Sequence, residues 1–358
     1  MRPRRVAALR QSLADAHLSG LLLTGLANIR YITGFSGSSA LVVVTARHVV
    51  LVTDFRYQTQ VVAEVGDFAR VVIEPQSLWT ALWRALEGLD AEILGFESSH
   101  LLHRDFQRLL DGPSQWQWRP ATDLVERLRE RKDADELAHI RQAVATAEHA
   151  LGETVPRIGA GMTELTVAGM LENALRDAGS EAFPFPTIVA AGARSALPHA
   201  RSSSRLIGKN EWLLIDFGAV VNGYCSDITR TFFVGHADDR HREVYEIVRE
   251  ANALSSAAVV PGMNGRDADA VARRYIEDRG HGAAFGHSLG HGIGLEVHEA
   301  PRLASTAEGL LPAGAVVTIE PGIYLPDWGG VRIEDDVYLD GSGSRILTTF
   351  TRELLELA

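Results

Sequence analysis

The segment Glu211–Val234 places the strongest constraint on how this chain can fold. It reads EWLLIDFGAVVNGYCSDITRTFFV, with two runs rich in β-branched and aromatic residues on either side of Asn222-Gly223. Asn-Gly between two such runs favours a two-residue turn, because both residues tolerate the positive φ that this turn needs. The segment is therefore predicted to form a β-hairpin.

The predicted turn fixes which residues of the hairpin face each other. In the register of a two-residue turn, Asp216 lies opposite Thr229, and Asp227 lies two residues before Thr229 on the same strand. Side chains at i and i+2 share a face, so the two carboxylates become diagonal neighbours, about 7 Å apart at the backbone. Buried carboxylates need a metal ion, a proton or an ionic partner. The pair is thus a candidate metal site, unless a loop or bulge breaks the register and leaves one aspartate in solvent.

Length and composition restrict the remaining possibilities. The 358 residues suffice for two domains with a large core, and 46% hydrophobic with 23% charged residues is typical of a soluble globular protein. A net charge of −11 argues against nucleic acid as a partner. No apolar run reaches the length of a membrane span, no signal peptide is evident, and the single cysteine fits a reducing compartment. We therefore expect a cytoplasmic protein without a membrane partner.

The pattern of apolar residues predicts two domains with a boundary near residue 125. Residues 1–125 alternate short strands and helices, with a border segment at Pro113–Thr122, and indicate a smaller α/β domain with a mixed sheet. Residues 126–358 begin with charged helices and return to strand patterns near the C-terminus, for example at Val331–Leu339. Strands grouped apart from helices indicate an α+β fold for this larger domain.

A glycine-rich segment, Gly286–Glu299, offers a competing interpretation. It reads GHSLGHGIGLEVHE, and its first five residues match G-x-S-x-G, the nucleophile elbow of α/β-hydrolases, with Ser288 as nucleophile. That motif needs a buried strand before it and a helix after it, whereas here further glycines follow. The order of serine, acid and histidine leaves only Glu296 and His298 as partners. A serine hydrolase using Ser288 is therefore an alternative that the local sequence disfavours.

The same segment and the C-terminal strands supply further candidate ligands. His291 lies among the glycines, Glu320 ends an apolar strand in TIEPG, and Glu334 lies beside Arg332 in VRIEDD. Alone, Glu334 could simply form an ion pair with Arg332 on one strand face. Together with the two hairpin aspartates, these residues make four carboxylates and one imidazole, a set that suits two divalent ions such as Mn²⁺, Co²⁺ or Zn²⁺. Two adjacent ions can activate one water molecule and polarise a carbonyl group.

The ordered series of motifs resembles the metal-dependent pita-bread peptidases. The sequences IDFG, SDITRTF, GHSLGHGIGLEVHE, TIEPGIY and VRIEDD are similar to those of the prolidase and aminopeptidase P branch, the Xaa-Pro peptidases. The resemblance covers the chain from about residue 132 to the end, and the N-terminal α/β domain resembles that of the same branch. It implies a C-terminal pita-bread catalytic domain preceded by a smaller creatinase-like domain. Creatinase shares this fold without metal, but all five ligands are present here.

The resemblance also implies a role for each matching residue. Asp227 and Glu334 would bridge both metal ions. Asp216 would bind one ion, and His291 with Glu320 would bind the other, with Glu320 also acting as general base. The residues implied to contact the substrate, to stabilise negative charge on it or to orient a ligand are His199, His287, His298, Tyr324, Arg332 and Arg302.

The resulting hypothesis is a metallopeptidase that cleaves the bond between an N-terminal residue and proline. Dipeptide substrates, as in prolidase, are preferred because the chain is compact, and Arg302 is a candidate partner for the substrate carboxylate. Aminopeptidase P activity on longer peptides is the alternative, and a peptide-binding module without catalysis is another. The resemblance also implies at least a homodimer, in which Asp54, Arg56 or Tyr57 of one subunit closes the site of its neighbour. Mn²⁺ is the expected metal, with Co²⁺ or Zn²⁺ as alternatives.

Overall fold

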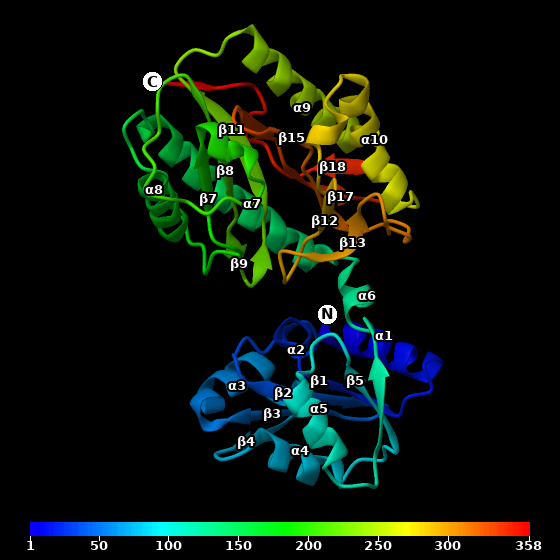
Figure 1. Cartoon of the computed structure of the whole chain (residues 1–358). Helices are drawn as coiled ribbons and strands as arrows, with labels where there is room; N and C mark the ends of the chain where they lie inside the picture. Colours follow the sequence, from blue (N-terminus) through cyan, green and yellow to red (C-terminus); the bar gives the residue numbers. More distant parts are fainter. The chain divides into compact units, whose positions relative to one another are not determined.

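The computed structural model describes all residues, 1–358, and the contacts of the chain divide it into two compact units. The N-terminal domain is Met1–Arg129, and the C-terminal domain is Glu130–Ala358. Figure 1 shows that each domain has its own sheets and helices. No helix in either domain combines the length and the apolar composition that a membrane crossing requires.

A six-stranded sheet forms the centre of the N-terminal domain. Its strands are β1 (Gly20–Leu23), β2 (Ala40–Thr45), β3 (Val49–Asp54), β4 (Arg70–Glu74), β5 (Ile93–Glu97) and β6 (Gln117–Ala121). They lie in the order β4-β3-β2-β1-β5-β6. Strand β1 pairs antiparallel with β2 and parallel with β5, which confirms the predicted mixed sheet.

Helices cover both faces of this sheet (Figure 1). The helical segments are α1 (Arg2–Asp15), α2 (Leu26–Thr33), η1 (Phe55–Tyr57), α3 (Gln58–Val65), η2 (Gly66–Phe68), α4 (Leu78–Leu86), α5 (His103–Leu110) and α6 (Glu126–Arg129). Helix α4 begins where the Ser77 hydroxyl accepts a hydrogen bond from the backbone N–H of Thr80. Its apolar face, including Leu82 and Leu86, packs on strands β1 to β3 and β5.

Two elements of this domain differ from the sequence prediction. The border segment predicted at Pro113–Thr122 contains strand β6, which pairs parallel with β5 at the sheet edge. An edge strand tolerates Pro120, because one side of the strand has no partner for a backbone N–H. Helix α2 was not predicted, since its 8 residues are too few to show a clear helical period.

Two larger sheets form the core of the C-terminal domain. The first contains β7 (Ile188–Ala191), β8 (Glu211–Phe217), β11 (Ile228–Val234) and β19 (Glu356–Leu357), in the order β19-β11-β8-β7. The second contains β12 (Gly290–Gly292), β13 (Glu299–Leu303), β14 (Val316–Ile319), β17 (Asp335–Leu339) and β18 (Ser344–Ile346), in the order β13-β12-β14-β17-β18. Two small hairpins are β9 (Val220–Val221) with β10 (Tyr224–Cys225) and β15 (Gly322–Leu325) with β16 (Gly329–Arg332).

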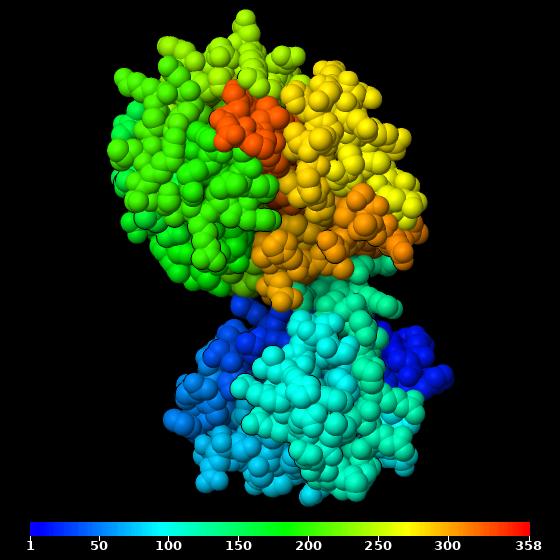
Figure 2. Space-filling model, in the orientation of Figure 1, coloured from blue at the N-terminus to red at the C-terminus, as the bar shows by residue number.

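Four long helices pack against these sheets. The helical segments are α7 (Ala134–Thr154), η3 (Val155–Arg157), α8 (Glu164–Asp177), η4 (Gly192–Ala196), α9 (Asp239–Ala258), α10 (Gly265–Asp278) and η5 (Gly282–Ala284). Helices α7 and α8 share one apolar cluster with β7, β8 and β11, and α9 and α10 share another with β14, β16 and β17. In Figure 2 the tip of the β15–β16 hairpin, in orange-red, reaches the surface between green and yellow segments of the chain. The strands are thus grouped in sheets and the helices pack against them, which confirms the predicted α+β domain.

The hairpin predicted from the Asn-Gly turn is present, but its strands are interrupted. Asn222 and Gly223 have positive φ values of 49° and 78°, and Asp216 pairs with Thr229, which confirms the predicted turn and register. The chain leaves the regular ladder between β8 and β9 and again between β10 and β11. Asp227 lies in the second break, and not on a continuous strand as the pattern predicted.

The single strand predicted at Val331–Leu339 is wrong. Strand β16 ends at Arg332 and β17 begins at Asp335, and the two strands belong to different sheets. The two residues between them include Glu334, whose backbone N–H donates to the Thr229 carbonyl in the first sheet. An apolar run cannot reveal that the chain changes sheets, because both halves are buried in the same way.

Gly290→Ala is expected to destabilise the C-terminal domain. A Cβ atom at Gly290 would lie 2.0 Å from the carbonyl oxygen of Thr318, so one of two packed strands has to move. Overpacking of this kind costs about 1–3 kcal/mol. The matched control is Gly286→Ala, because no atom lies within 4 Å of a Cβ added there. Urea unfolding curves compare the variants, and equal midpoints would contradict the close approach of the strands.

Candidate metal centre

The five predicted metal ligands come from strands or strand ends of both large sheets and the hairpins in the C-terminal domain. Their positions are Asp216 on β8, Asp227 before β11, His291 on β12, Glu320 after β14 and Glu334 between β16 and β17. Strand β8 is paired on both sides, and so is β14. The backbone hydrogen bonds of the sheets therefore hold these positions, which limits how far the side chains can move apart.

The structure brings these side chains together. One ligand atom each from Asp227, His291 and Glu334 lies within 4.8 Å of the others. Nε2 of His291 is 3.8 Å from Oδ2 of Asp227 and 3.5 Å from Oε1 of Glu320. Asp216 lies close enough that its charge raises the pKa of Asp227, Glu320 and Glu334. All five side chains thus face one small volume.

Burial and mutual repulsion oppose the simultaneous ionisation of the four carboxyl groups. Burial, followed by the charges of Glu334, Asp216 and Glu320, raises the pKa of Asp227 well above its usual range. Burial also raises the pKa of Glu334 well above its usual range and that of Glu320 to about 8. The buried Oδ1 atoms of Asp216 and Asp227 have no hydrogen-bond partner. This oxygen-rich set with unpartnered oxygens fits divalent metal ions.

The imidazole of His291 is in the form that a metal ligand requires. Its Nδ1 donates to the carbonyl oxygen of Gly292 at 3.0 Å, so the lone pair is on Nε2, which faces the carboxylates. Burial lowers the pKa of His291 to about 4, with a further contribution from the charge of His298. The ring is therefore neutral at pH 7 and can bind a metal without first losing a proton.

Arg332 connects three parts of this group. Its Nη2 lies 2.5 Å from Oδ2 of Asp216, its Nε donates to the Thr229 hydroxyl at 3.0 Å, and its Nη1 donates to the Tyr324 hydroxyl at 2.8 Å. Thr229 donates in turn to Oε2 of Glu334 at 2.6 Å. Arg332 thus pairs with Asp216, and not with Glu334 as strand alternation suggested. Thr229 was not selected from the sequence, although its register opposite Asp216 was the available signal.

His287 is fixed by hydrogen bonds at both ring nitrogens. Nδ1 donates to the carbonyl oxygen of Ser288 at 2.8 Å, and Nε2 lies 2.8 Å from the Tyr324 hydroxyl. Burial lowers the pKa of His287 to about 4, so its ring is neutral at pH 7 and Nε2 accepts the Tyr324 proton. Nδ1 also lies 4.0 Å from Oε2 of Glu320, which places the ring beside the metal-ligand group.

His298, His199 and Arg302 lie near the predicted ligands. The ring centroids of His298 and His291 are 4.3 Å apart. His199 is exposed, and its charge contributes to the pKa values of Asp216 and His298. Arg302 pairs with His291 across β12 and β13, so the two side chains share one face of the sheet. All three side chains are exposed, so a bound molecule can reach them.

The serine nucleophile considered in the sequence analysis lacks the surroundings it needs. Ser288 lies between η5 and β12, so a strand follows it instead of the helix of a nucleophile elbow. Its carbonyl oxygen is used to orient His287. The segment serves to place histidines and not to expose a serine.

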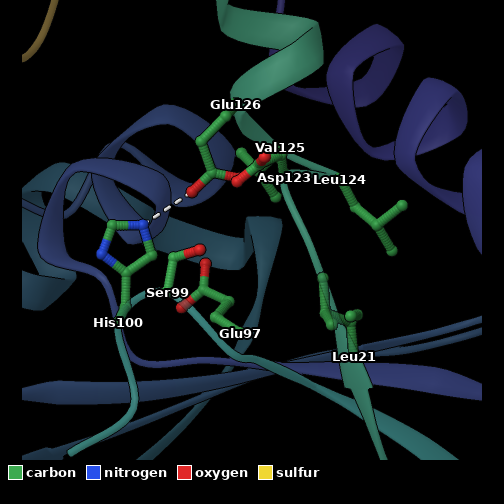
Figure 3. A pocket seen from close by; sticks show the side chains of 9 residues that line it. Leu21, Glu97, Ser99, His100, Asp123, Leu124, Val125 and Glu126 are labelled. Atoms are coloured by element: carbon green, nitrogen blue, oxygen red, sulfur yellow. Dashed lines mark hydrogen bonds and ion pairs between the residues drawn. The ribbon is translucent and has the colours of Figure 1, made fainter.

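A second group of possible ligands lies in the N-terminal domain. Glu97, His100 and Glu126 each place one ligand atom within 4.8 Å of the others (Figure 3). The side-chain amide of Asn28 donates to both carboxylates, at 2.7 and 2.5 Å, and Nε2 of His100 lies 2.7 Å from Oε1 of Glu126. Glu97 also accepts from the backbone N–H of Gly25 at 2.7 Å. These carboxylates already have donors, so the group is explained as a hydrogen-bond cluster without a metal.

The fold and the ligand set define a metallopeptidase. More specifically, the chain belongs to metallopeptidase family M24, whose model matches residues 138–340. The model of the creatinase/prolidase N-terminal domain matches residues 5–131. These matches confirm the family and the two kinds of domain that the order of the motifs predicted.

Relatives of this chain share its architecture over nearly their whole length. A Xaa-Pro dipeptidase from Pyrococcus horikoshii is 35% identical over 340 residues, which cover 94% of this chain and 95% of the relative. The solved structure of a Xaa-Pro dipeptidase from Bacillus anthracis is 36% identical, covers 100% of both chains and has a TM-score of 0.96. The structure of an X-Pro aminopeptidase from Thermotoga maritima is also 36% identical, covers 98% of this chain and 99% of that one, and has a TM-score of 0.92.

Mn²⁺ is expected to raise the melting temperature of the chelator-treated protein by binding to the C-terminal group. A ligand that binds only the folded state stabilises it, by about 2.7 kcal/mol at a hundred times its Kd. Asp227→Asn should abolish most of this shift, whereas His100→Gln in the N-terminal cluster should retain it. Scanning calorimetry with and without Mn²⁺ makes the comparison. The opposite pattern would place the cation in the N-terminal cluster.

Proposed function

We propose that this protein is a Xaa-Pro dipeptidase that hydrolyses the bond between an N-terminal residue and proline. The observation that carries the proposal is the cluster of acidic side chains around the imidazole of His291, in which one oxygen each of Asp216 and Asp227 has no hydrogen-bond partner. Relatives named Xaa-Pro dipeptidase align with this chain over nearly its full length. The substrate is a small peptide with proline at the second position.

The five ligands would hold two divalent ions, with Asp227 and Glu334 contacting both. Asp216 would bind one ion, and His291 with Glu320 the other. When bound, the ions polarise the scissile carbonyl and lower the pKa of a water molecule. Mn²⁺ is proposed as the metal because carboxylate-rich sites suit it, and Co²⁺ or Zn²⁺ are accepted by the same ligands.

The chain's own residues complete the reaction. Glu320 would take a proton from the attacking water and pass it to the proline nitrogen, which must be protonated to leave as an amine when the C–N bond breaks. His298 and His199 would donate hydrogen bonds to the negative charge that develops on the carbonyl oxygen. His287 and Tyr324 would line the substrate site, since their mutual hydrogen bond fixes both side chains.

Arg302 supports the choice of dipeptides over longer peptides. Its position opposite His291 places a guanidinium group on the face of the sheet that carries a predicted metal ligand. The carboxylate of an Xaa-Pro dipeptide lies close to the scissile bond, whereas a longer peptide has an amide there. A guanidinium group binds a carboxylate through paired hydrogen bonds.

We further propose that the enzyme works in the cytoplasm as a homodimer. The segment around Phe55 supports a contact with a second subunit, since this large apolar side chain is 64% exposed. Next to it, Arg56 forms an exposed ion pair with Asp54 at 2.8 Å, and Tyr57 lies beside them. Asp54, Arg56 and Tyr57 are the residues proposed to approach the site of the neighbouring subunit.

The proposed activity predicts metal-dependent cleavage of an Xaa-Pro dipeptide in preference to the matching Xaa-Pro-Xaa tripeptide. Each substrate is tested after chelation and after addition of Mn²⁺, Co²⁺ or Zn²⁺, with product measured by chromatography. Asp227→Asn and Glu334→Gln should each reduce turnover by at least about a hundredfold without unfolding the protein. Preference for the tripeptide would identify an aminopeptidase P, and full turnover in either variant would contradict the metal-centre mechanism.

Arg302→Met is expected to lower kcat/KM for the dipeptide by about 10- to 100-fold, mainly through KM, because a hydrogen bond to a charged group contributes about 1.5–3 kcal/mol. The effect should vanish with the dipeptide amide, which has no carboxylate. The control is Arg345→Met, which removes an exposed arginine on β18 from the same domain. An equal loss with the dipeptide and its amide would rule out a carboxylate contact.

A further inference from the structure

One buried carboxylate outside the metal-ligand group accepts hydrogen bonds from a single loop. Glu164, the first residue of α8, is 0% exposed. Its Oε1 accepts hydrogen bonds from the backbone N–H of Ala191 at 2.9 Å and from Nε of Arg194 at 3.0 Å. Its Oε2 accepts from the backbone N–H and the hydroxyl of Ser203, at 3.0 and 2.6 Å. A buried charge needs such partners, and here all of them come from one segment.

These contacts close the loop that carries His199. Glu164 joins the end of β7 to Ser203, which lie on either side of His199 in the chain. Arg194 extends the contact, because its Nη2 donates to the carbonyl oxygen of Arg201 at 2.5 Å. We call Glu164 and Arg194 the loop clamp. Ordering one backbone residue costs about 1–2 kcal/mol, so a loop fixed in advance avoids that cost when substrate binds.

The other side of the loop is attached to residues of the candidate metal centre. Nη1 of Arg332 donates to the carbonyl oxygen of Pro198 at 3.3 Å. The hydroxyl of Ser195 accepts the backbone N–H of Gly330 on β16 at 2.7 Å. Arg332 thus holds the backbone directly before His199, and the loop clamp holds the loop on both sides of it, at Ala191 and at Ser203. His199 and its neighbours on the same loop line an open cavity of about 560 Å³.

We propose that Glu164 and Arg194 are positioning residues for the reaction, which hold the imidazole of His199 at the substrate carbonyl. The inference rests on the role proposed above for His199. The loop clamp does not touch the predicted metal ligands, so its loss should leave metal binding intact. A shift of about 1 Å in a catalytic group can reduce the rate by up to about a hundredfold.

A double-mutant cycle with His199 tests this inference on the full-length, metal-loaded enzyme. Glu164→Gln keeps the size of the side chain but removes its charge, and should lower kcat for an Xaa-Pro dipeptide about tenfold while KM changes less than about twofold. In a His199→Ala background the same substitution should lower kcat less than about twofold, because the group it positions is absent. An equal loss in both backgrounds, or no loss in the native background, overturns the proposal.

Two further variants separate positioning from stability. Arg194→Gln is the second test of the loop clamp if Glu164→Gln does not fold, since the Arg194 side chain is partly exposed at 31%. Glu97→Gln is the matched control, because Glu97 is also buried and also holds a loop through backbone N–H groups. It should lower the melting temperature and leave kcat unchanged.

The metal content of each variant is measured alongside kcat, and loss of metal in Glu164→Gln would overturn the positioning role.

The result for His199→Ala alone separates this inference from the proposed function. Full activity of that variant would contradict the catalytic role of His199 and overturn the loop clamp with it. Reduced activity of His199→Ala, with an additive effect of Glu164→Gln, would overturn the loop clamp alone.

Discussion

The repulsion among buried carboxylates is the constraint on which the C-terminal domain depends. Asp227 is surrounded by the charges of Glu334, Asp216 and Glu320, and a further buried carboxylate, Asp336, accepts its backbone N–H at 3.1 Å. The buried Oδ1 atom of each of Asp216, Asp227 and Asp336 has no hydrogen-bond donor. Such a group is costly to fold unless protons or cations neutralise it. The two sheets supply the necessary rigidity, and divalent cations bound at this group would supply the opposite charge.

The N-terminal domain contains two neighbouring acids, one buried and one partly buried, and stabilises them in a different way. The amide of Asn28 lies between the carboxylates of Glu97 and Glu126 and donates to both. A neutral donor suffices there because backbone N–H groups and His100 provide the remaining hydrogen bonds. The contrast shows why the presence of acids and a histidine is not enough to identify a metal site. The unpartnered oxygens distinguish the C-terminal group.

The sequence predicted the local features of the fold well. The Asn222-Gly223 turn and the pairing of Asp216 with Thr229 follow from backbone preferences of adjacent residues. Strand β6 and the division of Val331–Leu339 between two sheets were missed. Both depend on where a segment lies in a sheet, which the apolar pattern of the segment does not record.

By itself, the sequence determined the hairpin register, the order of the five candidate ligands and the family to which they point, because these features are written in short motifs. Only the tertiary structure decided which groups pair with one another. Arg332 and Asp216 are 116 positions apart, and Glu164 reaches Arg194 and Ser203 across 30 and 39 positions. Such contacts form because the fold buries charges that must find partners, and no local pattern specifies which partner will be near.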